Sequence, residues 1–303
     1  MTEQLSKSVC AVFVTYFPDV QFIGRLKRIL PQVTTLLIID NTPSKSRTFD
    51  VKGAIQELHQ VLLIENRFNL GIAAALNQGL AYAAAEGYEW IVTLDQDTQA
   101  NLEMVSTLLK LARACDATPV VIGSNYFDPQ ANRTKVPSGN RGDDYLEQKT
   151  VITSGSLVHV HRALQIGGFR DDYFIDQVDH EFCLRARARG YAILISCQPL
   201  MTHSVGMPGG VRLPFLGTLP NHPPIRKYYI ARNTIVTVVT HWRTEPAWSL
   251  RRLVRLFLGL IEMALLEQYR IRKVRAFAVG VIDGLQSRLG PCNRKWLMLD
   301  DPK

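Results

Sequence analysis

The sequence lacks the features of secreted, membrane-spanning and disulfide-stabilised proteins. Its five cysteines are odd in number and scattered, without the paired spacing of a zinc site or a disulfide framework, so a reduced cytoplasmic protein is expected. No segment reaches the roughly 20 consecutive apolar residues that cross a bilayer. Lys7 is followed directly by a strand-like run from Val9 to Val14, so no signal peptide is expected either.

Two phosphate-binding motifs are also absent. The sequence has no Gly-x-x-x-x-Gly-Lys loop and no Gly-x-Gly-x-x-Gly after a predicted strand, which speaks against a P-loop ATPase and a nicotinamide enzyme. Acidic residues are scarce at one end of the chain, because residues 243–275 hold eight arginines and lysines against three glutamates. The C-terminal part is therefore the basic end of a chain with a net charge of +8.

Apolar runs separated by turn residues recur through the first half of the chain. Continuous runs of this kind predict strands that are buried on both faces. Helical patterns at 72–85 and 102–114 separate several of these runs, so we expect an α/β fold with a mostly parallel central sheet flanked by helices. The runs are residues 9–15, 36–39, 61–64, 91–94 and 120–122.

Three further segments complete the predicted organisation. The polar stretch 126–149 and the stretch 204–224, which is rich in Pro and Gly, are expected to be surface loops of the kind that often cover a binding site. Past Pro246 the pattern becomes helical and rich in Arg, which predicts a C-terminal helical extension.

Asp95-Gln96-Asp97 closes the apolar run that begins at Trp90, so it stands where a buried strand leaves the predicted sheet. Alternate residues of an extended chain point the same way, so both carboxylates lie on one side. Two hard oxygen ligands there suit Mg²⁺ or Mn²⁺. The alternative is a pair of solvated carboxylates at the start of the helix expected near Asn101.

Other candidate residues follow the first strands. Thr15 and Tyr16 end the first strand and Asp40 ends the second, at the edge where open α/β sheets bind ligands. Asp40 can accept from a base N–H or a ribose hydroxyl, although a turn formed by Asp40 and Asn41 is an equally simple reading.

A helix preceded by a glycine offers a second approach to a ligand. Asn69, Gly71 and Asn77 place small or polar groups along this segment, and Gly71 permits close backbone approach. The alternative is a capped turn between strand and helix.

A second acidic cluster lies between residues 174 and 185. Asp176 and Asp179 lead into a predicted helix, and a carboxylate is a natural general base for a sugar hydroxyl. Alternatively, one of these aspartates caps the helix while Glu181 and Arg185 pair at i,i+4, which still leaves one carboxylate over.

Cations and one histidine complete the set of candidates. Arg226 and Arg232 flank a pair of tyrosines and offer positive charge for a diphosphate, although a basic helix flank explains them as well. His203 follows the strand-like run 191–195 and is a candidate metal ligand or phosphate contact.

Taken together, these motifs resemble family-2 inverting glycosyltransferases of the GT-A fold, and among them bacterial rhamnosyltransferases. The stretch from Arg226 to Asn233 matches the pattern Arg-x-Tyr-Tyr-x-x-Arg-Asn found in the latter group. The resemblance covers residues 8–240. The other motifs are Val12 to Tyr16, Ile39 to Asn41, Asn69 to Ala73, Asn77 to Gly79, Asp95 to Asp97, Gly167 to Phe169 and Asp176 to Glu181.

The resemblance implies a role for each site residue. Asp40 would contact the nucleoside, Asp95 the ribose or the metal, and Asp97 a divalent ion, Mg²⁺ or Mn²⁺, that bridges the diphosphate. Asp179 falls on the position of the catalytic base, with Asp176 as helper or rival, and His203 on a metal-binding position of some relatives. The residues implied in nucleotide-sugar binding are Thr15, Tyr16, Asp40, Asn69, Gly71, Asn77, Asp95, Arg226 and Arg232.

The resemblance also implies a domain plan and a reaction. Residues 1–240 would form a Rossmann-like GT-A domain, with a nucleotide-sugar half at 1–125 and an acceptor half at 126–240. Residues 241–303 would form a basic amphipathic helical region. The expected activity is inverting transfer of a sugar, L-rhamnose from dTDP-L-rhamnose in the first instance, to a lipid-linked glycan such as O-antigen.

Several alternatives remain open from the sequence. The donor can be another nucleotide sugar, and a nucleotidyltransferase shares the sheet and metal logic but needs a Gly-rich basic loop that the chain lacks near Thr15. A non-catalytic membrane-binding module would use the basic C-terminal end. Because an apolar stripe accompanies Arg251, Arg252 and Arg255, we expect peripheral contact with anionic lipid on the inner face of the cell membrane, and no nucleic-acid binding.

Overall fold

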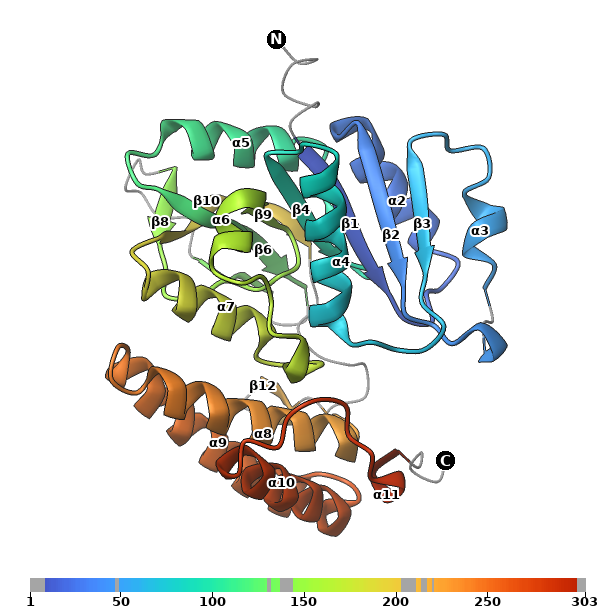
Figure 1. Ribbon diagram of the computed structural model, residues 1–303. Helices are drawn as coiled ribbons and strands as arrows, with labels where there is room; N and C mark the ends of the chain where they lie inside the picture. The colour runs from blue at the N-terminus through green and yellow to red at the C-terminus, as the bar shows by residue number, and fades with distance from the viewer. Residues whose placement is uncertain are drawn as a thin grey trace.

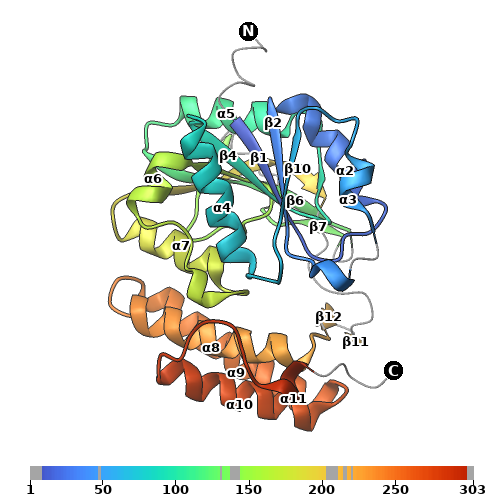
Figure 2. The ribbon, with the colours of Figure 1, turned by 45° about the vertical axis from the view of Figure 1, so that its right-hand side comes forward.

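The computed structural model describes residues 9–46, 49–129, 132–136, 144–202, 211–213, 217–219 and 221–298. A central sheet with helices on both faces forms the upper part of the molecule in Figure 1, and the C-terminal helices form a layer below it. Figure 2 shows the same two parts after rotation, with the C-terminal layer under the sheet edge where β1 and β2 end.

The central sheet has the strand order β3-β2-β1-β4-β9-β6-β10-β5, with β7 paired to β6 and β8 to β10. The β1–β2, β2–β3, β1–β4 and β6–β10 pairs are parallel, whereas β9 lies antiparallel between β4 and β6. This confirms the α/β fold with a mostly parallel sheet. The strands are β1 (Val9–Thr15), β2 (Thr35–Asp40), β3 (Val61–Glu65), β4 (Trp90–Asp95), β5 (Gln99–Ala100), β6 (Pro119–Asp128), β7 (Arg133–Thr134), β8 (Tyr145–Glu147), β9 (Ser156–His159) and β10 (Ala192–Thr202).

Alternating residues of the strands feed two apolar cores, one on each face of the sheet. In β1, Ala11 and Phe13 pack with helices α2 and α5, whereas Cys10 and Val12 pack with α4, α6 and α7. Burial of both faces explains why the strands are continuously apolar. The helices of this part are α2 (Phe22–Ile29), α3 (Val51–Ala54), α4 (Ile72–Ala85), α5 (Met104–Ala114), α6 (Val160–Gln165) and α7 (Val178–Arg187), with short 3₁₀ turns at Leu30–Gln32, Ser44–Ser46 and Asp171–Tyr173.

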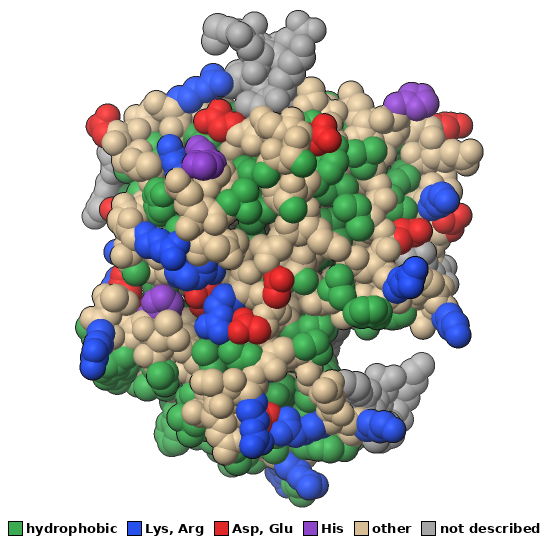
Figure 3. Space-filling view, viewed as in Figure 1, with side chains coloured by type: hydrophobic (Ala, Val, Ile, Leu, Met, Phe, Trp, Pro, Cys, Tyr) green, Lys and Arg blue, Asp and Glu red, His purple; other side chains and the backbone are tan. Residues whose placement is uncertain are grey.

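The C-terminal layer consists of α8 (Pro224–His241), α9 (Pro246–Leu266), α10 (Arg270–Leu285) and α11 (Lys295–Met298). Glycines let α10 lie directly on α8: a Cβ on Gly284 would stand 2.7 Å from the carbonyl oxygen of Arg232. This confirms the predicted C-terminal helical extension. Hydrophobic and basic side chains gather over these helices in the lower part of Figure 3.

Two segments differ from the sequence predictions. The stretch 126–149 was expected to be a loop, but β6 continues to Asp128, and β7 and β8 pair with the sheet. Polar residues form strands here because they lie at the sheet periphery, where one face meets water. Of the stretch 204–224, the described parts form the hairpin β11 (Val211–Leu213) and β12 (Gly217–Leu219) and the start of α8.

None of the helices in the described ranges has the length and apolarity needed to span a bilayer.

Candidate functional site

The parallel register of three central strands brings the predicted residues to one edge. Thr15 is paired with Asp40, and Val14 with Asp95, so the ends of β1, β2 and β4 are level. Asp40 is buried and its Oδ1 accepts hydrogen bonds from Thr15 Oγ1 at 3.0 Å and Thr42 Oγ1 at 2.7 Å. Asp40 therefore forms the predicted turn and also fixes two hydroxyl groups at the sheet edge.

The Asp95–Asp97 segment is held in place from three sides. The Tyr16 N–H donates to Gln96 Oε1 at 2.7 Å, Arg25 donates to the Gln96 carbonyl at 3.1 Å, and the Asp95 N–H donates to Ser154 Oγ at 3.2 Å. The next helix, α5, begins only at Met104, after the short strand β5. The two carboxylates therefore do not start that helix, and the choice between solvated carboxylates and metal ligands stays open.

The donor set at this edge fits a hard divalent cation but does not by itself complete a coordination shell. Asp95 is half-buried and Asp97 is exposed, so their oxygens lie at the boundary with solvent. Within the described ranges, no group of three or more His, Cys, Asp or Glu side chains is placed to hold a metal ion. His203 lies outside the described residues. The metal ligands Asp95, Asp97 and His203 remain predictions.

Residues 169–177, which precede α7 and include Asp176, are called the acidic loop. Gly71 and Asn77 contact this loop although they lie about 100 residues before it in the sequence. Gly71 has a φ of +87°, and a Cβ there would stand 2.5 Å from the Phe174 carbonyl oxygen, which also accepts from the Ile72 N–H at 2.8 Å. The Asn77 side chain donates to the Phe169 carbonyl and accepts from the Phe169 N–H, both at 2.8 Å. Both residues therefore support residues 169–174. Asn69 accepts from the Gly71 N–H at 2.8 Å and shapes the turn between them.

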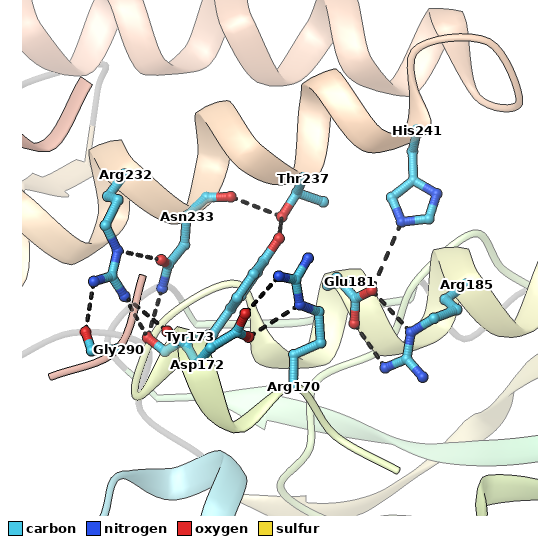
Figure 4. Close-up of polar contacts among 10 residues, drawn as sticks. All are labelled: Arg170, Asp172, Tyr173, Glu181, Arg185, Arg232, Asn233, Thr237, His241 and Gly290. Atoms are coloured by element: carbon cyan, nitrogen blue, oxygen red, sulfur yellow. Dashed lines mark hydrogen bonds and ion pairs between the residues drawn. The ribbon is translucent and has the colours of Figure 1, made fainter. Parts of the chain in front are cut away.

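The loop that carries Asp176 has an unusual backbone. Phe174, Asp176 and Gln177 all have positive φ, at 66°, 63° and 64°, which costs about 1 to 3 kcal/mol for each non-glycine residue. Asn233 of α8 offsets this cost, because its Nδ2 donates to the carbonyl oxygens of Tyr173, Ile175 and Asp176 at 2.9, 2.8 and 3.0 Å. Figure 4 shows Asn233 pointing from α8 at this loop.

Arg232 supports the same loop from inside the protein. Its side chain is 1% exposed and donates to the carbonyl oxygens of Asp172, Tyr173 and Gly290, as Figure 4 shows in part. The guanidinium carbon also lies 4.8 Å from the ring centre of Tyr229. The structure therefore gives Arg232 a structural role, and the nucleotide-sugar contact predicted for it stays a prediction.

Asp176 and Arg226 form an ion pair at the entrance to helix α7. Arg226 Nη2 lies 3.3 Å from Asp176 Oδ1. Burial raises the pKa of the Asp176 carboxyl and the nearby Asp179 adds to the rise, whereas Arg226 lowers it. The structure brings these three predicted residues together, 50 positions apart in sequence.

Neither aspartate caps helix α7. The helix begins at Val178, its N-cap is Gln177, and no side chain closes this end. Asp179 lies in the first turn, half-buried, where its Oδ1 accepts from the N–H of His180 at 2.8 Å.

Glu181 has the structural role that its spacing predicts. Both carboxylate oxygens accept from Arg185 at 2.8 Å, and His241 lies 4.0 Å away (Figure 4). Although burial opposes it, the nearby His241 and the hydrogen bonds from Arg185 lower the pKa of Glu181. The predicted i,i+4 pair is confirmed, so the carboxylates left for chemistry are Asp176 and Asp179.

Helix α9 contributes two residues that the sequence did not reveal. Arg252 donates to Gln177 Oε1 at 3.4 Å, and its guanidinium carbon lies 5.7 Å from the Trp248 ring. Burial lowers the pKa of Arg252, whereas the negative charges of Asp179 and Asp176 raise it. The i,i+4 spacing of Trp248 and Arg252 could have indicated their contact from the sequence. The arginines around Arg252 instead favoured the interpretation that it is a surface residue.

Comparison with known proteins assigns this arrangement to a family. Residues 20–169 match Glycosyl transferase family 2. The dTDP-rhamnosyl transferase RfbF of Shigella flexneri is 26% identical over 299 residues, which cover 94% of this chain and 98% of that protein. The relative thus extends past the family match to include the acidic loop and the C-terminal helices.

Solved structures agree on the fold. The crystal structure of residues 1–349 of S. aureus TarS matches with a TM-score of 0.58 at 10% identity, covering 92% of both chains. S. aureus TarS in complex with UDP-GlcNAc matches with a TM-score of 0.55 at 11% identity, again over 92% of both chains. The family match, the relative along most of the chain and the shared fold together show that this chain is a glycosyltransferase with a family 2 domain and the GT-A fold.

Proposed function

We propose that the protein transfers L-rhamnose from dTDP-L-rhamnose to a hydroxyl group of a lipid-linked cell-surface glycan, such as O-antigen, with inversion at the anomeric carbon. The observation that carries this proposal is similarity over nearly the whole chain to a dTDP-rhamnosyl transferase, including the segment with Asp176 and Asp179. A nucleotide sugar would lie across the ends of β1, β2 and β4, with Asp40, Thr15 and Tyr16 at the nucleoside.

Asp179 is the proposed base. It removes the proton from the acceptor hydroxyl as the hydroxyl oxygen forms its bond to the anomeric carbon. The bond between that carbon and the diphosphate oxygen breaks on the opposite face, and dTDP leaves with the electron pair. Arg226 pairs with Asp176, and Arg252 adds a second positive charge near both aspartates.

Asp95 and Asp97 would hold Mg²⁺ or Mn²⁺, which would supply the positive charge that neutralises the leaving diphosphate. Magnesium sites of this kind use one or two carboxylates together with substrate phosphates, which agrees with the small donor set of the described residues. The bound ion would stabilise negative charge on the departing oxygen. His203 is a further proposed ligand.

Replacement of Asp97 by Ala tests donor and metal together. We expect calorimetry to show Mn²⁺-dependent binding of dTDP-L-rhamnose to the native chain, with at least a 10-fold loss of affinity in Asp97→Ala, since one charged ligand contact contributes about 1.5 to 3 kcal/mol. UDP-glucose and GDP-mannose serve as competing donors. Asp116→Ala, an exposed carboxylate at the end of α5, is the matched control.

Each other result has a defined meaning. Preferred binding of UDP-glucose or GDP-mannose would keep the enzyme class and overturn the choice of rhamnose. Equal donor affinity in Asp97→Ala and Asp116→Ala would remove Asp97 from the metal site.

The C-terminal helices supply the proposed membrane contact. Residues 241–303 expose large apolar side chains on α9, including Phe257 at 62% and Leu265 at 68% exposure, beside exposed arginines. Such a face suits peripheral binding to the inner surface of the cell membrane, where a lipid-linked acceptor is found. The domain plan of residues 1–240 and 241–303 is part of this proposal, with the qualification that Arg252 reaches from the second region into the site of the first.

Arg252 offers a test of that shared site. Arg252→Ala should reduce kcat for transfer roughly 10- to 100-fold, because a charged hydrogen-bonding group beside Asp179 is lost. Donor affinity should stay within about twofold. Arg251→Ala, one position away and exposed, should leave both quantities unchanged. Equal rates for the two variants would mean that Arg252 has no role in transfer and belongs only to the basic surface predicted from the sequence.

A further inference from the structure

Two adjoining cavities form a groove at the start of α10. The first, of about 610 Å³, is lined by Arg270, Arg272 and Arg275 and by the rings of Tyr269 and Trp296. The second, of about 410 Å³, shares Arg270 and Arg275 with the first. It continues along the small and apolar side chains of Ala264, Val274 and Ala278. The groove therefore has a basic end and an apolar end.

The positive charge of this groove is not cancelled by the acid that lines it. Glu267 already pairs with Lys227 at 2.5 Å and with Lys273 at 2.9 Å. In the part of the chain that the structure describes, Arg270 and Arg275 form no ion pair, and the guanidinium carbon of Arg275 lies 5.1 Å from the Trp296 ring centre. The two arginines thus remain able to bind an anion.

Local stability does not explain the placement of these cations. Arg270 occupies the first turn of α10, where the helix dipole disfavours positive charge by about 0.3 to 1 kcal/mol. The Ile271 side chain, which lines both cavities, is also left in water at 82% exposure. Both costs would be offset by one ligand that carries a negative head and an apolar tail.

We propose that this groove, formed by α9, α10 and Trp296, binds the phosphate group of an anionic membrane lipid. Arg270 and Arg275 donate to the phosphate oxygens, and the start of an acyl chain lies along Ala264, Val274 and Ala278. The inference rests on the proposed membrane-linked function. In place of a general basic surface, it assigns the lipid headgroup to one defined groove.

Calorimetry of the full chain with the soluble lipid dihexanoyl phosphatidylglycerol tests the groove. We expect saturable binding that weakens at least 10-fold in Arg270→Gln/Arg275→Gln. The variant Arg251→Gln/Arg255→Gln removes the same charge from exposed positions of α9 and should bind the lipid as the native chain does. Inorganic phosphate, which has the charge without the chain, should bind at least 10-fold more weakly than the lipid.

Three results would overturn the proposal that this groove binds a lipid headgroup. Equal losses in the two double variants would show a diffuse charge effect, and phosphate binding as tight as lipid binding would show an anion site without a lipid role. A change of sedimentation coefficient in Arg270→Gln/Arg275→Gln without loss of lipid binding would identify a second copy of the chain as the occupant.

Donor binding separates this inference from the proposed function. Calorimetry with dTDP-L-rhamnose and Mn²⁺ should give the same affinity for the native chain and both double variants, because no residue that lines the groove is among those proposed to hold the donor. Lost lipid binding with intact donor binding supports the groove. Absence of donor binding in the native chain would overturn the rhamnose proposal alone.

Discussion

Replacement of Asp179 by Asn should lower kcat for sugar transfer by about 100- to 10,000-fold, which is the usual contribution of a general base. The amide has nearly the same shape as the carboxylate, and its oxygen can still accept from the N–H of His180. It cannot take a proton from the acceptor hydroxyl. Donor affinity, measured by calorimetry, should therefore stay within about twofold while the initial rate collapses.

Asp176→Asn distinguishes the two acids of this loop. Asp176 forms an ion pair with Arg226, so Asp176→Asn removes a charge that holds Arg226 in place. We expect this variant to bind donor or acceptor more weakly. Its kcat should fall less than that of Asp179→Asn. Burial raises the pKa of Asp176, so this carboxylate takes up a proton at a higher pH than an ordinary aspartate. On the acid side, activity should fall as Asp176 becomes protonated, and this part of the pH profile should flatten in Asp176→Asn.

Asp116→Asn is the control for both variants, since Asp116 is exposed at the far end of α5. If Asp176→Asn abolishes transfer while Asp179→Asn retains it, the base is Asp176, and Asp179 becomes its electrostatic partner.

Apolar runs predicted the central strands because burial on both faces leaves no room for polar residues. The predicted helix at 72–85 coincides with α4. Strand β9 was missed because its four residues, Ser156–His159, are too few to show a pattern. Its antiparallel place between β4 and β6 depends on pairing across more than 30 residues of sequence, which no local preference encodes.

The residues of the candidate site also fall into two groups, those predictable from local sequence and those whose role depends on a distant partner. Asp40, Asp95 and Asp97 were predictable because the end of a parallel strand is both a local feature and a functional position. The roles of Gly71 and Arg232 were not, because each is decided by a distant partner: Phe174 for Gly71 and the carbonyl oxygens near Tyr173 for Arg232. A residue type that suits a ligand suits a buried loop equally well.

Asn233→Ala should reduce kcat more than 100-fold although Asn233 is not expected to touch either substrate. Its amide holds three carbonyl oxygens of a loop in which three non-glycine residues have positive φ, so its loss lets the loop relax and moves Asp176 and Asp179. The free energy of unfolding should fall by about 2 to 4 kcal/mol as buried groups lose partners. Urea unfolding and initial rates measure the two effects.

A matched variant separates positioning from stability. Asn125 is also fully buried, and its side chain donates at 2.9 Å to the carbonyl oxygens of Val136 and Cys197, so Asn125→Ala should destabilise the fold to a similar extent. Its bonds lie in and beside the sheet rather than in the acidic loop, so at temperatures where the variant is folded it should keep kcat within a few-fold of native. If both variants lose kcat in proportion to their stability, Asn233 is a structural residue. A loss confined to Asn233→Ala, with donor affinity unchanged, means that α8 acts on the reaction by fixing the backbone that carries the base. It would also explain why the motif from Arg226 to Asn233 ends in an asparagine that is buried away from solvent.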